Sequence, residues 1–562
     1  MRGMRISMKD WVQSGSPWVW LNAGAVAISV IMVVGLLALI AVRGLAHFWP
    51  SDVVMTEVAS VDGRPPLTLI GELVDQESVP ASQLRSAGIK VPEGVEFADR
   101  WLIKVGNRQA FGSDFKWVLD QHMGPKRYPA HLLVMERREW GNFYGYLIGL
   151  KEKGRLIGEQ PVGKNDLWPE LERRIQRAVE IYDQIEQIEK VEIGAINYQI
   201  EQLRLKQKRL KLNDELTAEA LDQLNAQRQT LKQRYETLQQ QRNQLYQQLN
   251  RDSMIGQLSD GQQVEVKLGQ VVRAYQPNAM GVGEKVSFYV QKIWEFLSDD
   301  PREANTEGGI FPAIYGTVLM VLLMSVLVTP FGVIAAVYLR EYAKQGFITR
   351  LIRIAVNNLA GVPSIVYGVF GLGFFVYFLG GAIDTAFFPE AAPSPVFGTG
   401  GLMWASLTLA LLTLPVVIVA TEEGLSRIPR SVREGSLALG ATKAETLWRV
   451  VLPMASPAMM TGLILAVARA AGEVAPLMLV GVVKLAPSLP LDGNAPFLHL
   501  DRKFMHLGFH IYDVGFQSPN VEAARPLVYA TALLLVIVIG LLNVAAIAIR
   551  NRLREKYKAL ES

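Results

Sequence analysis

The sequence contains no cysteine among its 562 residues. This absence excludes disulfides, thiolate metal sites, iron–sulfur clusters and a cysteine nucleophile. Net charge is small as well, because 57 Lys and Arg oppose 53 Asp and Glu and leave +4. A charge of this size in a chain of this length gives no reason to expect a nucleic acid partner.

Motifs for catalysis are also missing. The sequence has no G-x-x-x-x-G-K-[ST] phosphate-binding loop, no H-E-x-x-H and no G-x-S-x-G. His506 and His510 stand four residues apart with Asp513 close by, but a turn at a membrane interface explains them more simply than a metal. We therefore predict a chain that is not an enzyme and holds neither a metal nor a cofactor of its own.

Half of the residues are hydrophobic and a fifth are charged, and the two classes occupy different parts of the chain. About 20 apolar residues in a helix can cross the hydrocarbon layer of a membrane. Six runs meet this length: Leu21–Val42, Phe311–Tyr338, Ala360–Gly380, Leu402–Ala420, Ala458–Val483 and Arg525–Ile549. The first is too long for a signal peptide and is predicted to be an uncleaved anchor.

Basic residues in the short connecting loops predict the orientation. Segments 1–17, 339–353, 421–456 and 550–562 carry 17 Lys and Arg, whereas loop 381–401 carries none. Both termini, the tails 1–20 and 550–562, are therefore predicted to be cytoplasmic. The long segment 43–310, which holds 35 of the 57 basic residues, is then extracytoplasmic.

Segment 43–310 is expected to contain a small β domain that carries a helical hairpin. Apolar runs bounded by turn residues predict strands at Leu67–Val74, Trp101–Val105, His131–Met135, Phe143–Leu150, Val264–Leu268 and Val271–Tyr275. Between them, segment 167–250 is rich in Gln, Glu, Lys and Arg and has almost no Gly or Pro. The dipeptide Asn213-Asp214 is the expected break between its two helices. We interpret it as an antiparallel helical pair, which serves either as a spacer or as a docking arm for a partner.

The second half of this pair has a heptad pattern. Its positions alternate steps of three and four residues: Leu221, Leu224, Arg228, Leu231, Tyr235, Leu238, Arg242, Leu245 and Leu249. Such spacing places all nine side chains on one stripe of a helix. The stripe is the expected seam of the hairpin.

The most specific motif lies in the predicted cytoplasmic loop 431–453, between the fourth and fifth spans. Capping boxes are expected at Ser431 with Glu434 and at Thr442 with Glu445, and Pro453 is expected to end the second of two short helices. Gly440 is expected to supply the left-handed turn between them. The pattern E-[AG]-[AS]-x3-G-x9-[IV]-x-L-P is matched by Glu434, Gly435, Ser436, Gly440, Val450, Leu452 and Pro453.

This motif resembles the EAA loop of ABC importer permeases, the segment that fits a cleft on the ATP-hydrolysing subunit. The stretches Asn358–Leu372 and Ala466–Leu477 further resemble the PstA-type permease of phosphate-specific ABC transporters. The resemblance extends from Ile310 to the C-terminus and does not include 43–310. It implies an α-helical membrane protein in which the anchor 21–42 and the insertion 43–310, with its β structure and hairpin, precede a five-helix permease core at 311–549.

Two ionisable residues, Arg469 and Glu473, interrupt the fifth apolar run at i,i+4 spacing. A charge in mid-membrane is costly, so the pair is either a structural ion pair or part of the substrate path. The resemblance favours the path, with Arg469 contacting phosphate oxygens. Many such permeases carry an arginine where this chain has Val419, so a second cation would come from elsewhere; Thr421 and Glu422 are expected at the water-exposed edge.

The resemblance implies a multi-pass protein of the bacterial inner membrane that works by alternating access. A periplasmic phosphate-binding protein would deliver inorganic phosphate to a pair of permeases, and P-loop ATPase subunits would bind Mg-ATP and drive loop 431–453. Two other functions remain open at this point. The substrate could be another oxyanion such as sulfate, molybdate or a phosphonate, or the chain could be a membrane sensor or scaffold that acts through its outer hairpin.

Overall fold

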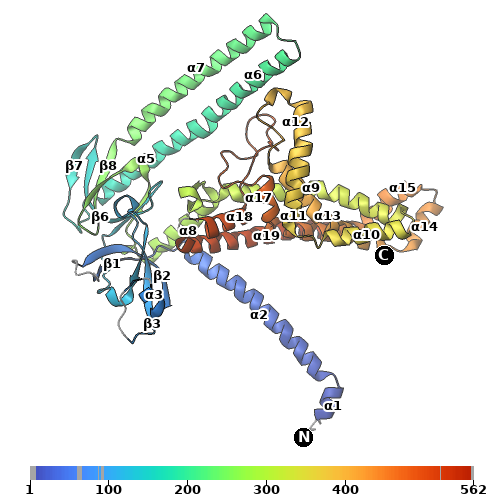
Figure 1. Ribbon diagram of the computed structural model, residues 1–562, viewed down its shortest axis with the longest axis horizontal. Coiled ribbons are helices and arrows are strands. Elements are labelled where there is room, and N and C mark those ends of the chain that lie inside the picture. The colour runs from blue at the N-terminus through green and yellow to red at the C-terminus, as the bar shows by residue number, and fades with distance from the viewer. Residues whose placement is uncertain (1–7, 60–65, 87, 90–93, 519–520, 558–562) are drawn as a thin grey trace.

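Six helices long and apolar enough to cross a membrane are present in the computed structural model, as the sequence predicts. The structure describes residues 8–59, 66–86, 88–89, 94–518 and 521–557. In the two predicted cytoplasmic tails, residues 1–7, which include Arg2 and Arg5, and residues 558–562 lie outside these ranges. The six helices are Ser16–Ala46, Phe311–Tyr342, Ser364–Phe387, Leu402–Arg427, Lys443–Gly472 and Ala524–Glu555. Five of them form one body (Figure 1).

Small residues allow the helices of this body to approach closely. The main contacts join α9 (Phe311–Val337), α13 (Leu402–Arg427), α16 (Leu452–Gly472) and α19 (Val521–Tyr557). A Cβ on Gly424 would come within 2.6 Å of the Cβ of Ala458, and one on Gly462 within 2.5 Å of the Cβ of Ala420. Glycine at these two positions therefore permits the close packing of α13 on α16, as is common between membrane helices.

The fifth span corrects the predicted boundaries Ala458–Val483. It begins at Lys443, passes through a π-helical segment (η8, Leu447–Val451) and ends with α16 at Gly472. Glu473 is extended, and the short helix α17 (Ala475–Val480) follows. Pro476 in the first turn of α17 has no backbone N–H to continue the hydrogen-bond ladder of α16, so the apolar run divides there.

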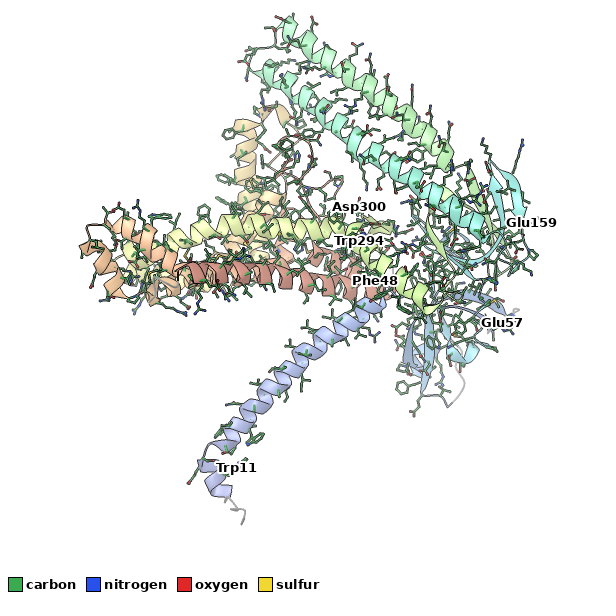
Figure 2. All side chains as sticks on the ribbon, turned by 180° about the vertical axis from the view of Figure 1, so that it is seen from behind. Trp11, Phe48, Glu57, Glu159, Trp294 and Asp300 are labelled. Atoms are coloured by element: carbon green, nitrogen blue, oxygen red, sulfur yellow. The ribbon has the colours of Figure 1, made fainter. Side chains whose placement is uncertain are left out.

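The N-terminal span, α2 (Ser16–Ala46), is almost separate from the body. None of the residues in its most apolar 18-residue window is buried, and Figure 2 shows Trp11, near its free end, far from the other spans. Only its C-terminal end packs: Gly44 lies against the backbone of Tyr529 and Ala530, and the ring of Phe48 lies 5.0 Å from that of Phe296 in α8 (Val282–Ser298).

The insertion contains two large antiparallel sheets and a two-stranded one, in which β11 (Pro301–Arg302) pairs with β12 (Glu307–Gly308). The first has the order β1-β2-β3-β4, with bounds Val53–Val58, Leu67–Pro80, Phe97–Lys104 and Phe115–Leu119. The second has the order β10-β5-β6-β8-β9, with β7 also paired to β6, and its bounds are Val271–Tyr275, Leu133–Arg137, Phe143–Glu152, Asp252–Gln257, Gln263–Lys267 and Arg155–Glu159. Each of the six predicted apolar runs overlaps one of these strands.

A long helical hairpin leaves the second sheet. Its first arm comprises α5 (Trp168–Glu186), a π-helical segment (η2, Gln187–Ile193) and α6 (Gly194–Leu212); its second arm is α7 (Ala218–Leu249). The chain turns at Asp214, whose φ is +57°. All nine positions of the predicted heptad stripe are buried or half-buried, whereas most residues between them are exposed. The seam and the antiparallel pairing are thus as the pattern indicates.

Candidate functional site: a surface knob and a broken helix

The knob consists of two short helical segments that connect α13 to α16 at the end of the body opposite the insertion (Figure 1). These are α14 (Arg430–Ala438) and α15 (Lys443–Thr446). Gly440 has a φ of +89° in the turn between them, and no atom lies within 4 Å of where its Cβ would be. The conformation of the turn, rather than lack of space, therefore requires glycine there.

One of the two predicted capping boxes forms. Thr442 caps α15: its Oγ1 accepts the N–H of Glu445 at 3.2 Å, and the Glu445 carboxylate accepts the N–H of Thr442 at 2.9 Å. The hydrogen bonds that the Glu445 carboxylate accepts from the N–H and the hydroxyl of Thr442 lower its pKa. The box predicted at Ser431 and Glu434 is wrong, because α14 begins at Arg430 and its N-cap position is Pro429, two residues before Ser431.

The prediction that Pro453 ends the second helix is also wrong. Pro453 lies in the first turn of α16, and the chain stays helical from Lys443 to Gly472. The missing N–H of a proline normally interrupts a helix. Here the π-helical segment η8 directly precedes it, and this wider turn is where the helix accommodates the local change in its hydrogen-bond ladder.

The remaining residues of the predicted ATPase-coupling motif divide into exposed and packed positions. Glu434 and Gly435 are exposed on α14, while Val450 and Leu452 are half-buried. Ser436 holds the knob together, because its hydroxyl lies 2.9 Å from that of Thr446 in α15. The motif thus supplies both an exposed surface and the contact that joins its two helices.

Two basic side chains attach the knob to the end of the second span. The Arg433 guanidinium donates to the backbone oxygens of Leu425 and Ile428, both at 2.8 Å, and to Oε1 of Glu341 at 2.9 Å. Lys443 donates to the backbone oxygen of Glu341. A displacement of the knob would therefore be transmitted directly to this span.

Three large apolar side chains on the knob are exposed to solvent, and the sequence reasoning missed them. Leu439 is 91% exposed, Trp448 is 70% exposed and Leu437 is 46% exposed. Apolar groups that gather on one projecting element are typical of a surface that another protein covers. The signal available in the sequence was their position inside a polar loop, beside the coupling motif.

Arg469 and Glu473 lie at the break in the fifth span. Arg469 is in the last turn of α16, and Glu473 is the extended residue that follows the helix. Their closest approach, from Nε to Oε1, is 3.8 Å, which is an ion pair but not a hydrogen bond. In the described part of the chain no hydrogen bond from the Arg469 guanidinium is found, and its side chain is 33% exposed.

The third span packs against this break. Gly368 in α11 (Ser364–Phe370) approaches so closely that a Cβ would lie 2.6 Å from the Cα of Pro476. The hydroxyl of the neighbouring Tyr367 donates to the backbone oxygen of Leu359 at 2.6 Å. The structure thus places Arg469 at the break of the fifth span, against which the third span packs.

The expected exposure of Thr421 and Glu422 is wrong. Thr421 is fully buried, and Glu422 forms an ion pair with Arg353 of α10 (Phe347–Leu359), Nη2 to Oε1 at 2.6 Å. Glu422 is half-buried, because α10 packs against α13. Arg353 is a second cation beside the spans that the sequence reasoning did not identify, but its charge is balanced by Glu422.

In the described residues, no group of three or more His, Asp or Glu side chains is arranged to hold a metal. His506 instead caps α18 (Leu507–Tyr512): its Nδ1 accepts the N–H of Gly508 at 3.1 Å. Burial lowers the pKa of His506 to about 3 and that of His510 to about 4. Both imidazoles are therefore neutral parts of the packing near pH 7.

Comparison with known proteins relates the C-terminal half to one family. The family model for the inner membrane component of binding-protein-dependent transport systems matches residues 328–558. The phosphate transport system permease protein PstA 1 of Mycobacterium tuberculosis is 37% identical over 247 residues, which are 43% of this chain and 71% of the relative. PstA of Yersinia pestis is 32% identical over 251 residues, 45% of this chain and 75% of the relative.

Among solved structures, a chain of the inward-facing MetNI methionine ABC transporter aligns at 20% identity with a TM-score of 0.32. The alignment covers 43% of this chain and 94% of that one. The family match begins at residue 328, so the sheets and the hairpin lie outside it.

Proposed function

Because the chain belongs to the family of inner membrane components of binding-protein-dependent transport systems, we propose that this ABC importer permease subunit carries inorganic phosphate. The ATPase site of such a transporter lies on a different subunit. The names of the relatives support the choice of substrate: the two compared above are phosphate transport system permeases.

The observation that carries the proposal is the loosely paired Arg469. A guanidinium presents several N–H donors in a fixed plane, which suits the oxygens of phosphate. Arg469 uses none of these donors in a hydrogen bond within the described residues, and its nearest carboxylate oxygen is 3.8 Å from Nε. A purely structural ion pair would be expected to close to hydrogen-bond distance, because an unsatisfied charge within a membrane span is costly.

Glu473 limits how tightly Arg469 holds the anion. Its carboxylate competes for the same guanidinium, so the bound anion gains only the difference between the two interactions. Transport requires a site that releases its ligand on the far side. The extended backbone at Glu473 also gives this residue more conformational freedom than a helical one, so the two side chains can separate when an anion arrives.

Coupling to ATP hydrolysis would occur at the knob. In this proposal the exposed Leu439 and Trp448 enter a cleft on a P-loop ATPase that binds Mg-ATP, while Arg433 and Lys443 transmit its movement to the second span. The chain itself supplies no nucleotide chemistry. A second permease subunit would complete the path, which opens alternately to the two sides of the membrane.

The orientation belongs to the same proposal. The basic residues of the short loops support a cytoplasmic position for both termini and the knob, and the sheets and hairpin would then face the periplasm. A phosphate-binding protein would deliver its ligand on that side.

The direct test is ATP-driven uptake of radiolabelled phosphate into vesicles that contain the assembled transporter. We expect an excess of unlabelled phosphate to suppress the uptake. The same concentration of sulfate, molybdate or a phosphonate should leave it unchanged. Suppression by one of these competitors alone would assign the path to that oxyanion. Copurification in mild detergent should recover a P-loop ATPase, and its absence in the presence of a folded chain would contradict the coupling scheme and favour a sensor or scaffold.

A further inference from the structure

A cavity of about 530 Å³ opens at the knob end of the body, where α13, α16 and α19 come together. Three arginines from two elements line it: Arg427 in the last turn of α13, and Arg550 and Arg554, one turn apart near the end of α19. Basic residues at the end of a membrane span are common. These three are unusual because they converge on one cavity.

The positive charge of this cavity is not balanced by the protein. No Asp or Glu lines it, and among the described residues no carboxylate lies within ion-pair distance of Arg427, Arg550 or Arg554. The hydrogen bond that Arg550 makes, at 3.4 Å, goes to the neutral side chain of Asn551. Like charges that share a cavity repel one another, so an anion bound between them would be stabilised by all three.

The rest of the lining is largely apolar. Ile428, Val432, Met454 and Pro457 form much of the wall, and Ile428 also belongs to the buried cluster beneath the knob. A free inorganic anion gains nothing from such a wall. A phosphate that carries a glycerol backbone and acyl chains does, because its apolar part leaves water when it packs there.

The position of the cavity along the spans supports the same ligand. It lies at the C-terminal ends of α13 and α19 and beside the first turns of α16, and basic pockets between membrane helices at such ends bind the headgroups of anionic lipids. We propose that this cavity holds the phosphate of an anionic phospholipid, with Arg427, Arg550 and Arg554 as donors and with the lipid's glycerol region against Pro457 and Met454. The inference goes beyond the transported anion and does not depend on which anion crosses the membrane.

The test is native mass spectrometry of the full chain with its copurifying subunits, titrated with phosphatidylglycerol or phosphatidylcholine. We expect phosphatidylglycerol to be retained preferentially. A charge-assisted hydrogen bond contributes on the order of 1.5–3 kcal/mol, so Arg554→Gln should weaken retention about tenfold or more. The matched control is Arg552→Gln, which removes an equal charge from the same helix outside the cavity and should change retention less than twofold.

Four results would overturn the proposal. The first is equal retention of phosphatidylcholine, and the second is an equal loss of phosphatidylglycerol in the Arg552 and Arg554 variants. The third is displacement of phosphatidylglycerol from the unaltered protein by millimolar inorganic phosphate, which would make the cavity a site for the free anion. If Arg554→Gln released the ATPase while lipid retention stayed normal, the cavity would belong to a protein interface instead. Uptake of phosphate is measured separately and tests the transport function alone.

Discussion

Arg209 in the hairpin and Glu390 in the loop after the third span form an ion pair although 181 residues separate them. The Arg209 Nε donates to Oε1 of Glu390 at 2.9 Å, and the carboxylate is almost completely buried. Two neighbouring contacts accompany it: Tyr198 donates to the backbone oxygen of Ala495 at 2.6 Å, and Lys208 donates to that of Ala392. The hairpin is therefore fastened to two loops of the permease core rather than projecting freely (Figure 2).

The two partners of this ion pair should respond differently to substitution. Arg209→Gln leaves a buried carboxylate without its cation, whereas Glu390→Gln leaves only an exposed arginine. We expect faster hydrogen exchange over 194–212 in both variants and a larger increase for Arg209→Gln. Arg204→Gln is the control, because its partner Glu201 lies in the same helix. Equal acceleration in the control would show that the Arg209 contact does not fasten the hairpin.

Arg469 should be required for transport. Removal of its charged donors by Arg469→Gln is expected to lower kcat/KM for phosphate uptake by about tenfold to a hundredfold, the effect of losing one charge-assisted hydrogen bond. Arg469→Lys should retain part of the activity, because lysine keeps the positive charge but lacks the planar guanidinium that can donate two parallel hydrogen bonds. The control is Arg350→Gln, an exposed cation of α10. Unchanged uptake by an Arg469→Gln variant that inserts normally would remove this residue from the path.

Glycine at position 440 should be needed for coupling. A β-branched residue at φ +89° is strained by about 1–2 kcal/mol or more, so Gly440→Val is expected to reshape the turn of the knob. We expect ATP hydrolysis to continue with less phosphate transported per ATP, measured in the same vesicles. Gly435→Ala should be tolerated, because Gly435 is helical and the site of its Cβ is open. An unchanged ratio of phosphate transported to ATP hydrolysed in Gly440→Val would argue against the role of the turn.

The exposed side chain of Leu439 should contribute to binding of the ATPase. Leu439→Ser removes an apolar group that is 91% exposed, so it should leave the fold intact and weaken the subunit contact by about 1–2 kcal/mol. Copurification of the ATPase at several detergent strengths provides the measurement. Leu485→Ser, an exposed apolar residue outside the knob, is the control, and identical recovery of the ATPase from both variants would contradict the proposed contact.

Acid should destabilise the region around α18. The unfolded chain protonates His506 and His510 near pH 6.5, but burial holds their pKa values in the folded chain at about 3 and about 4. Their contribution to stability is therefore complete above pH 6.5 and is lost as the pH falls toward 4. At pH 5 each histidine should cost about 2 kcal/mol. His510→Gln should reduce the fall in thermal unfolding temperature between pH 7.5 and pH 5, and an unchanged fall would exclude His510 as a cause.

Much of the local structure follows from periodicity. The nine-position stripe from Leu221 to Leu249 predicts which side of α7 is covered, because the 3.5-residue repeat of a coiled coil depends only on neighbours in the chain. The six spans are recognisable for a similar reason, since the length of an apolar run must match the membrane. Gly440 was predictable because few residues other than glycine adopt its backbone conformation readily.

Predictions failed where one local rule was overridden by its surroundings. Pro453 reads as a helix end, yet the π-helical turn before it lets the helix continue. Ser431 and Glu434 have capping-box spacing, but the N-cap of α14 is Pro429, two residues before Ser431. Thr421 and Glu422 sit near the end of an apolar run, where tertiary packing buries Thr421 and pairs Glu422 with Arg353 of α10.

The sequence by itself determined the membrane spans, the hairpin seam and the turn of the knob, since each depends on residues within a few turns of one another. Tertiary structure decided that Arg209 meets Glu390, that the third span packs against the break beside Arg469, and that Arg427 shares a cavity with Arg554. These side chains are distant in the sequence. Their approach depends on how whole helices pack, which no local pattern specifies.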